Sequence, residues 1–227
     1  MAGRINYYGN VVSNGLIMDL DAAKFDSYPK TGTRWYDITW TTSGGTLTNG
    51  PVFNSSNGGF FSFDGVDDLV NLGNQSFNTV TFDLWVNIQT FTGNRAILSK
   101  GSQALGSGAT FAAWIVSATN TVRNRFYNFS GNSAFVTTAS LTSNVWYNLT
   151  WTYDNSNVRL YTNSSLTETS AVVGPLIVTN NTNLLIASDF YTQSAEMRSS
   201  GFKMYNRALT QAEITQNYNA VKGRFGL

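Results

Sequence analysis

A strict alternation of apolar and polar side chains is the feature that most constrains the fold of this chain. In residues 80–88 (VTFDLWVNI), every even position is apolar, and residues 147–153 (YNLTWTY) repeat this period of two. Successive side chains of a strand point to opposite faces of a sheet, so both segments predict strands with one face on a core. Shorter segments of similar character, separated by turn signals rich in Gly and Asn, predict further strands at residues 16–20, 60–63, 69–72, 96–98, 111–116, 122–129, 158–161, 184–187 and 202–205.

Many short strands at this spacing predict an all-β sandwich or barrel. The 227 residues fit one such domain, and no internal repeat or linker-like tract divides them. We therefore expect a single domain over residues 15–227. Residues 1–14 lack a clear period, and we expect them to form either an arm that orders on a partner or a simple edge strand.

One helix is predicted near the C-terminus. Thr210 is a good N-cap and Glu213 follows three residues later, which is the pattern of a capping box. Leu209 and Ile214 flank this start and suit a hydrophobic staple, while Gly223 suits the left-handed position after the helix. We expect this helix to be a structural cap that docks against the sheets.

The composition of the chain excludes several classes of function. Charged residues make up only 12% of the chain and the net charge is +1, without a Lys/Arg run, so we expect no nucleic-acid partner. Cys and His are absent, which excludes disulfides, thiolate nucleophiles and Ser-His-Asp chemistry. No apolar run approaches the roughly 18 residues of a membrane helix. The N-terminus lacks a signal-peptide pattern, so we expect synthesis in a cytoplasm without membrane insertion.

Five segments, in order along the chain, resemble the concanavalin-like LamG jelly-roll family. They are residues 62–70 (SFDGVDDLV), 81–86 (TFDLWV), 97–101 (ILSKG), 145–154 (VWYNLTWTYD) and 205–214 (YNRALTQAEI). The resemblance implies a two-sheet antiparallel jelly-roll β-sandwich with one short C-terminal helix.

Both ends of the chain carry a narrower likeness. Residues 14–23 (NGLIMDLDAA) and 216–226 (QNYNAVKGRFG) resemble LamG-like proteins encoded by tailed phages, marine and cyanobacterial ones especially. This resemblance implies a virion structural protein, such as a capsid decoration, fibre or tail-associated component. Its expected partners are other virion proteins, further copies of itself as a homo-oligomer, and a cell-surface glycan. A free bacterial carbohydrate-binding lectin module is the alternative.

The densest group of carboxylates is Asp64, Asp67 and Asp68, which is a candidate calcium site because Ca²⁺ binds about six to eight oxygen ligands. Calcium-binding relatives often carry an acid just before the segment at residues 205–214, and residues 198–203 (RSSGFK) have none. We therefore favour a structural interpretation, in which Asp64 and Asp67 accept hydrogen bonds from backbone amides in a turn around Gly65. No cofactor is expected beyond this calcium candidate.

Two further pairs of charged residues share a strand face. Asp19 and Asp21 alternate with Leu20, and we expect a solvated face, with an ion or a pairing with Lys24 as the alternatives. Arg123 and Arg125 also share a face, which either is solvated or grips a carboxylate of a neighbouring subunit.

Aromatic side chains carry the binding hypothesis, because sugar rings stack on flat aromatic faces. Trp35, Tyr36 and Trp40 fall in a loop-rich region and are the predicted ligand-binding residues. Trp151 shares the apolar register of its strand and is expected in the core. Trp85 lies opposite the apolar register of its own strand, so it is either exposed or packed against a second layer.

Catalysis is not expected. Glycoside hydrolysis needs two carboxylates about 5–5.5 Å or 6.5–9.5 Å apart. The three glutamates, Glu168, Glu196 and Glu213, share no strand, and Glu213 is expected in the capping box. Asp83 is isolated on its strand. A glycan hydrolase with unconventional carboxylates is the remaining alternative to a binding protein.

Overall fold

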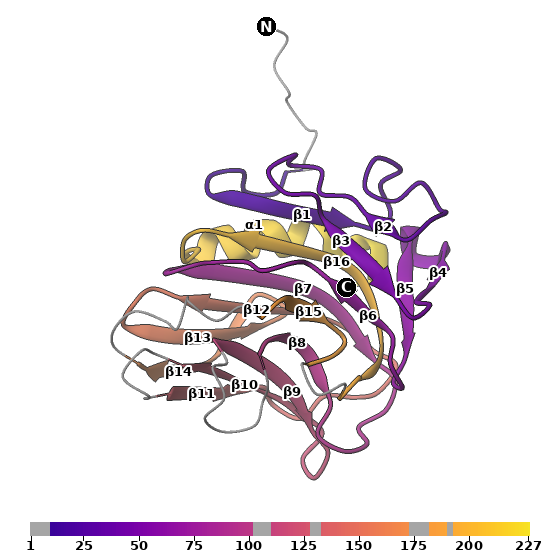
Figure 1. The fold of residues 1–227 in the computed structure, drawn as a ribbon. Coiled ribbons are helices and arrows are strands. Elements are labelled where there is room, and N and C mark those ends of the chain that lie inside the picture. The colour runs from indigo at the N-terminus through magenta and orange to yellow at the C-terminus, as the bar shows by residue number, and fades with distance from the viewer. Residues whose placement is uncertain (1–9, 102–109, 128–132, 173–181, 190–192) are drawn as a thin grey trace, which may run out of the picture.

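Two antiparallel sheets packed face to face make up the computed structural model (Figure 1), which describes residues 10–101, 110–127, 133–172, 182–189 and 193–227. Sheet A has the strand order β14-β13-β12-β7-β16-β5-β4, and β1 also pairs with β16. Its strands are β1 (Leu16–Asp21), β4 (Val52–Asn54), β5 (Phe60–Asp64), β7 (Val80–Ile88), β12 (Trp146–Tyr153), β13 (Asn157–Thr162), β14 (Ser165–Ala171) and β16 (Glu196–Tyr205).

Sheet B has the order β11-β10-β9-β8-β15-β6-β3-β2. Its strands are β2 (Arg34–Trp35), β3 (Gly45–Thr48), β6 (Leu69–Asn71), β8 (Ala96–Lys100), β9 (Phe111–Val116), β10 (Thr121–Tyr127), β11 (Ser133–Thr137) and β15 (Leu184–Ile186). A 3₁₀ turn, η1 (Ser56–Gly58), precedes β5. The predicted jelly-roll sandwich with one short C-terminal helix is confirmed.

Every predicted strand is present in the described residues, but the pattern missed β2, β3, β4, β11 and β14. Residues 128 and 129 of the strand predicted at 122–129 lie outside the described residues. Most of these strands are short, and β2, β4, β11 and β14 end the strand order of their sheets. A strand at an edge packs little side chain on the core, so β14 is mostly exposed and carries no alternation. The pattern also found only the second half of β16, because residues 198–201 (RSSG) hold no large apolar side chain.

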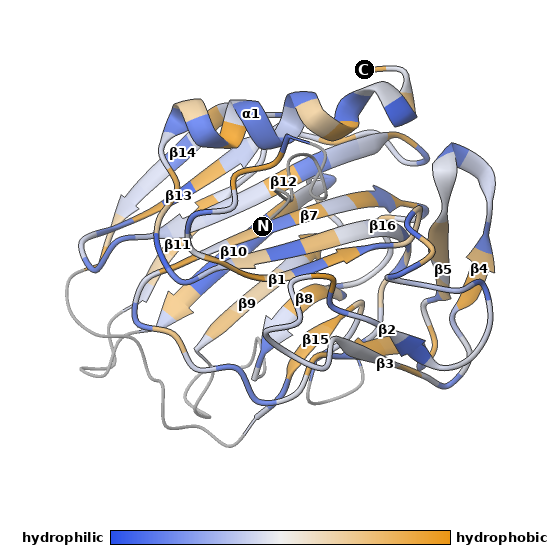
Figure 2. Cartoon of the chain, turned by 90° about the horizontal axis from the view of Figure 1, so that it is seen from above, coloured by the Kyte–Doolittle hydropathy of each residue, from blue (hydrophilic) through white to orange (hydrophobic). Residues whose placement is uncertain are grey.

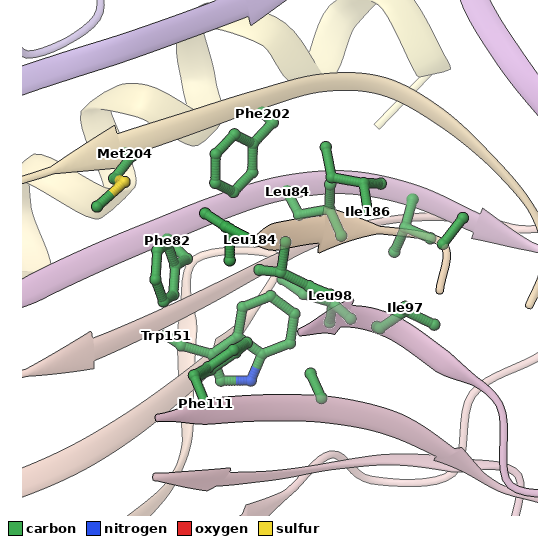
Figure 3. Close-up of a cluster of buried hydrophobic side chains, with 14 of the residues drawn as sticks. Phe82, Leu84, Ile97, Leu98, Phe111, Trp151, Leu184, Ile186, Phe202 and Met204 are labelled. Atoms are coloured by element: carbon green, nitrogen blue, oxygen red, sulfur yellow. The ribbon is translucent and has the colours of Figure 1, made fainter. Parts of the chain in front are cut away.

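The core lies between the sheets (Figure 3). Phe82 and Leu84 of β7 and Phe202 of β16 meet Leu98 and Phe111 from sheet B, and all five are fully buried. The ring centroids of Phe82 and Phe111 are 4.8 Å apart. Each buried side chain of this size contributes roughly 1.5–3 kcal/mol. Trp151 joins this cluster, as its register predicts.

A second layer covers part of the outer face of sheet A (Figure 2). It consists of α1 (Gln211–Val221) and the 3₁₀ turn η2 (Lys222–Phe225). The indole ring of Trp85 stacks on Tyr218, with centroids 5.7 Å apart, and on Phe225, at 4.5 Å. Trp85 therefore packs against a second layer, which is one of the two positions expected from its register.

The start of α1 is as predicted. Thr210 and Glu213 form both hydrogen bonds of a capping box, and Leu209 and Ile214 pack in one cluster. The predicted C-terminus is wrong, because Gly223 continues into η2 and Gly226, at φ 72°, takes the left-handed position instead. This extension by one 3₁₀ turn is what carries Phe225 onto Trp85.

The described part of the N-terminal arm packs on this layer. The backbone N–H of Val12 donates to Asn217 Oδ1 at 2.8 Å, and the Tyr205 hydroxyl donates to the Val12 carbonyl at 3.0 Å. Residues 10–12 therefore belong to the packed domain although they form no strand. Residues 1–9 lie outside the described residues, so the choice between arm and edge strand stays a prediction for them.

Candidate functional site

Two of the three predicted ligand-binding aromatics are on the surface. Tyr36 is 43% exposed and Trp40 is 70% exposed. Trp35 is fully buried, and its ring packs on Phe61 with a centroid distance of 4.8 Å. The assignment of Trp35 to a ligand-contacting surface is wrong, because Trp35 pairs with Gly45 in the short strand β2 and points into the core.

Asp37 organises the loop that presents these aromatics, which we call the Trp40 loop (residues 36–44). Its Oδ1 accepts hydrogen bonds from the backbone N–H groups of Asp19 and Thr39, both at 2.9 Å. Its Oδ2 accepts from the backbone N–H of Thr42 at 2.9 Å and from the hydroxyls of Thr39 and Thr42 at 2.7 and 3.0 Å. Asp37 is buried, and these five bonds tie the loop at Thr39 and Thr42 to β1 at Asp19.

Trp40 has a left-handed backbone, with φ 60°. For a bulky side chain this region is a genuine outlier, and strained residues cluster at binding sites. This strained backbone is not compensated by burial of the indole ring, because the Trp40 side chain points into solvent. The loop therefore holds a large flat apolar ring in solvent.

Phe25, which was not predicted as a site residue, is also 69% exposed. It lies in the connection between β1 and β2, which reaches the start of the Trp40 loop through a hydrogen bond from the Tyr36 N–H to the Ser27 carbonyl at 2.7 Å. The only signal in the sequence is its position between two charged residues, Lys24 and Asp26, outside any periodic segment.

The three acids of the calcium candidate come together in the turn between β5 and β6. One oxygen from each of Asp64, Asp67 and Asp68 lies within 4.8 Å of the others. Asp64 Oδ1 accepts from the Val66 N–H at 2.8 Å, and Asp68 Oδ2 accepts from the Asp64 N–H at 3.1 Å. Asp64 accepts a hydrogen bond from a backbone amide, as the structural interpretation predicts. The same role was expected of Asp67, but Asp68 has it instead. Burial and the neighbouring charges of Asp64 and Asp67 raise the pKa of Asp68.

Beside this turn is an open pocket of about 240 Å³ whose lining includes Asp64, Asp68 and Glu196. Glu196 is the cross-strand partner of Asp64, and its Oε2 accepts from the Thr90 hydroxyl at 2.9 Å. The sequence pattern did not predict that Glu196 lies beside Asp64, because the two residues are distant in sequence and the pairing of their strands was not predicted. Three acids therefore line this open pocket.

The solvated face expected for Asp19 and Asp21 is wrong. Asp19, Lys203 and Asp83 are aligned across the neighbouring strands β1, β16 and β7, and all three are buried. Lys203 Nζ is 3.6 Å from Asp19 Oδ1. Asp21 pairs with Arg224 of η2 at 2.8 Å. The cover provided by α1 and η2, which strand periodicity does not foresee, excludes these carboxylates from solvent.

Burial and the neighbouring charges act against each other on the pKa values within this buried row. Burial raises the pKa of Asp19 and of Asp83, although the charge of Lys203 opposes both shifts. Burial would lower the pKa of Lys203, but the charges of Asp19 and Asp83 raise it above its ordinary value. Asp83 is the one acid of β7, as the sequence predicts, and it also accepts a hydrogen bond from Asn148 of β12 at 2.9 Å.

Lys100 is a further buried charge that sequence analysis did not single out. Its Nζ donates to Asn74 Oδ1 and to the Thr182 carbonyl, both at 2.6 Å. Burial lowers the pKa of Lys100 to about 8. Both partners are neutral, so Lys100 anchors two connections to sheet B rather than forming an ion pair with either of them.

Arg123 and Arg125 share the outer face of β10, as predicted. The guanidinium carbon of Arg125 lies 4.3 Å from the ring centroid of Tyr127 and 4.7 Å from that of Phe135. The same carbon of Arg123 lies 5.9 Å from the centroid of Phe135. We call Arg123, Arg125, Tyr127, Phe135 and Trp114 the arginine face.

Family comparison agrees with this fold. Residues 64–215 match the family model described as the concanavalin A-like lectin/glucanases superfamily. The match spans more than half of the chain, which therefore belongs to this family. No curated protein matches the chain.

Solved structures with the same fold include bacterial toxin binding domains. The binding domain of botulinum neurotoxin serotype G is 17% identical with a TM-score of 0.67 and covers 89% of this chain. The binding domain of paraclostridial mosquitocidal protein 1 is 14% identical with a TM-score of 0.69 and covers 91%. The receptor-binding domain of botulinum neurotoxin D is 12% identical with a TM-score of 0.69 and covers 90%.

This chain spans 50%, 52% and 52% of the lengths of those three structures. At such low identity the likeness concerns the fold, which is lectin-like and shared with receptor-binding domains. Within the described parts of the chain, no helix has the length and apolar character needed to span a bilayer.

Proposed function

We propose that this chain is a non-enzymatic attachment protein of a virus particle, and that it binds a cell-surface glycan through Tyr36 and Trp40. The observation that carries the glycan site is the Trp40 loop, where an indole ring that is 70% exposed stands on a strained backbone fixed by Asp37. A preorganised aromatic surface loses little entropy on binding, which favours affinity for sugar rings.

The attachment role is supported by the lectin-like fold and by the toxin receptor-binding domains that share it. The virus assignment rests on the resemblance of residues 14–23 and 216–226 to proteins of tailed phages. Weakly charged, polar surfaces such as this one, with 12% charged residues, suit binding by hydrogen bonds and stacking. Assembly with other virion proteins and with further copies of the chain is part of the same proposal.

Absence of catalysis is proposed on the chemistry of the chain. It has no His or Cys to act as base or nucleophile. Glu213 is engaged by Arg207 at 2.6 Å and by the helix cap, while Asp19 and Asp83 lie buried in a row with Lys203. A hydrolase would have to use the acids of the open pocket, Asp64, Asp68 and Glu196. Polysaccharide cleavage that Glu196→Gln abolishes would overturn this proposal.

The glycan site is tested with Trp40→Asn. Asparagine adopts the left-handed region readily, so this variant removes the indole ring and keeps the loop conformation. We expect binding on a glycan array to fall at least tenfold, because stacking on the exposed ring is lost. Leu166→Ser, which removes an exposed apolar side chain from β14, is the matched control and should bind as the unaltered chain does.

Equal binding by Trp40→Asn and the control would exclude the Trp40 loop as the glycan site. The proposal that the chain belongs to a virus particle is tested separately, by looking for this chain in purified virions. Detection in infected-cell lysate but never in purified particles would favour the free bacterial lectin module instead.

A further inference from the structure

The arginine face lies on the outer side of sheet B, on strands β9, β10 and β11. Val122 and Phe126 of β10 point into the core, so the alternate residues Arg123 and Arg125 point outward. Arg125 lies opposite Phe135 on one side and Ala112 on the other, and Arg123 lies opposite Trp114. The backbone positions of Arg123 and Arg125 thus lie about 7 Å apart along one strand, next to aromatic residues of the neighbouring strands.

Stacking on these rings orients the guanidinium of Arg125. A guanidinium that lies over an aromatic ring is attracted by the ring face, while its N–H groups point outward in its own plane. Arg125 Nε is buried and has no hydrogen-bond acceptor. Phe135 is 41% exposed, so an apolar ring surface remains open beside the charged groups.

The charge of this face is uncompensated. Arg159, Arg207 and Arg224 each pair with an acid, at Asp154, Glu213 and Asp21. All 13 acidic residues lie in the described parts of the chain, and neither Arg123 nor Arg125 forms an ion pair with any of them.

Glu168 is the acid that approaches this region. Its Oε2 accepts from the backbone N–H of Thr137 at 2.6 Å, and Thr137 is the cross-strand partner of Arg123. This carboxylate therefore caps the exposed edge of β11. Arg123 Nε donates to Thr137 Oγ1 at 3.4 Å, and the arginine face keeps two cations without an ionic partner among the described residues.

We propose that the arginine face is a second binding site, which takes the carboxylate of an acidic sugar. The planar guanidinium fork matches the two oxygens of a carboxylate, and the apolar face of the sugar ring suits the open ring of Phe135. This site is separate from the Trp40 loop, and the inference goes beyond the function proposed above. The inference does not require that the arginine face and the Trp40 loop bind the same glycan.

The test uses the full chain and three soluble polysaccharides: polygalacturonate, dextran sulfate and uncharged dextran. We expect the unaltered chain to bind polygalacturonate more tightly than dextran sulfate, and to bind it less tightly as salt rises, because exposed charges are screened. Arg123→Gln/Arg125→Gln should weaken polygalacturonate binding at least tenfold. Arg123→Lys/Arg125→Lys keeps both charges but loses the fork, and we expect a loss of at least threefold.

Two controls separate this site from general charge effects and from the Trp40 loop. Lys30→Gln removes one exposed positive charge elsewhere and should leave polygalacturonate binding unchanged. Trp40→Asn should leave it unchanged as well, so failure at one site is distinguishable from failure at the other. Matched thermal unfolding of all variants confirms that each one is folded.

Several results would overturn the inference. One is failure of the unaltered chain to bind polygalacturonate, and another is equal binding by the double glutamine variant. Equal affinity for dextran sulfate and polygalacturonate, kept by the lysine variant, would mean a general anion surface instead of a carboxylate site. A change of oligomeric state in the glutamine variant without a change in binding would assign the face to contacts between copies of this chain.

Discussion

The outer faces of the two sheets both carry charged residues, but these residues lie in opposite surroundings. On sheet A, Asp19, Lys203 and Asp83 are aligned across three strands and are buried. On sheet B, Arg123 is exposed and Arg125 is partly buried, and neither has an ionic partner among the described residues. The first face is closed by α1 and η2, whereas open aromatic and guanidinium groups remain on the second.

The difference separates structural charges from charges that are available for binding. A buried charge must be matched inside the protein, because desolvation is compensated only by a partner at short range. An exposed charge is solvated, so it can stay unmatched until a ligand arrives. The presence of a charge therefore does not tell whether a residue stabilises the fold or is available for binding. What distinguishes the two cases in this sandwich is whether a second layer covers the charge.

Removal of Lys203 should have the largest effect. Lys203→Met leaves Asp19 and Asp83 buried without a cation, and we expect the free energy of unfolding at neutral pH to fall by roughly 3–5 kcal/mol. Because the pKa values of both acids are raised by burial, protonation at lower pH should relieve part of this loss. Urea unfolding at several pH values measures both effects.

A compensated variant is the control for this prediction. Asp19→Asn/Lys203→Met/Asp83→Asn removes all three charges together and should recover much of the stability lost in Lys203→Met. If the single substitution lowers stability by less than about 1 kcal/mol, the row is not the matched set that the comparison requires.

A smaller effect is expected at the start of the covering helix. Hydrogen bonds from Arg207 lower the pKa of Glu213 to about 2, helped by Thr210 and opposed by burial. A lowered pKa in the folded state means that this stabilisation is complete above the ordinary value near 4.5 and is lost as pH falls toward 2. Glu213→Gln should lower the free energy of unfolding at pH 7 by about 1.5 kcal/mol, through the cap and the ion pair.

The pH profile makes this prediction specific. Between pH 5 and 2, the stability of Glu213→Gln should fall less steeply than that of the unaltered chain, because its carboxylate no longer titrates. Parallel profiles would assign the acid sensitivity to other groups, such as Asp21, whose pKa is lowered by Arg224 against the effect of burial.

Sequence patterns predicted the parts of this molecule that depend on local chemistry. Alternation found β7 and β12, and the residues of the capping box found α1, since each signal is complete within ten residues. The exposed positions of Tyr36 and Trp40 followed from their place outside any period. These features do not depend on what packs above them.

Positions set by long-range packing were not predictable from the same patterns. Trp35 is buried because a two-residue strand pairs it with Gly45, and no period exists over two residues. Asp21 is buried and pairs with Arg224, which lies 203 positions later, and Glu196 meets Asp64 only through strand pairing. A pattern along one strand gives the face of a side chain, but it does not tell whether that face is covered.

The smallest effect is expected on the arginine face, and it completes the comparison. Arg123→Gln/Arg125→Gln removes two cations that have no ionic partner, so we expect the free energy of unfolding to change by less than about 1 kcal/mol, mostly through lost stacking on Phe135 and Tyr127. Urea unfolding beside Lys203→Met measures the contrast directly. A loss as large as that of Lys203→Met would show that these arginines stabilise the fold as the buried row does, and the distinction between covered and open charges would fail.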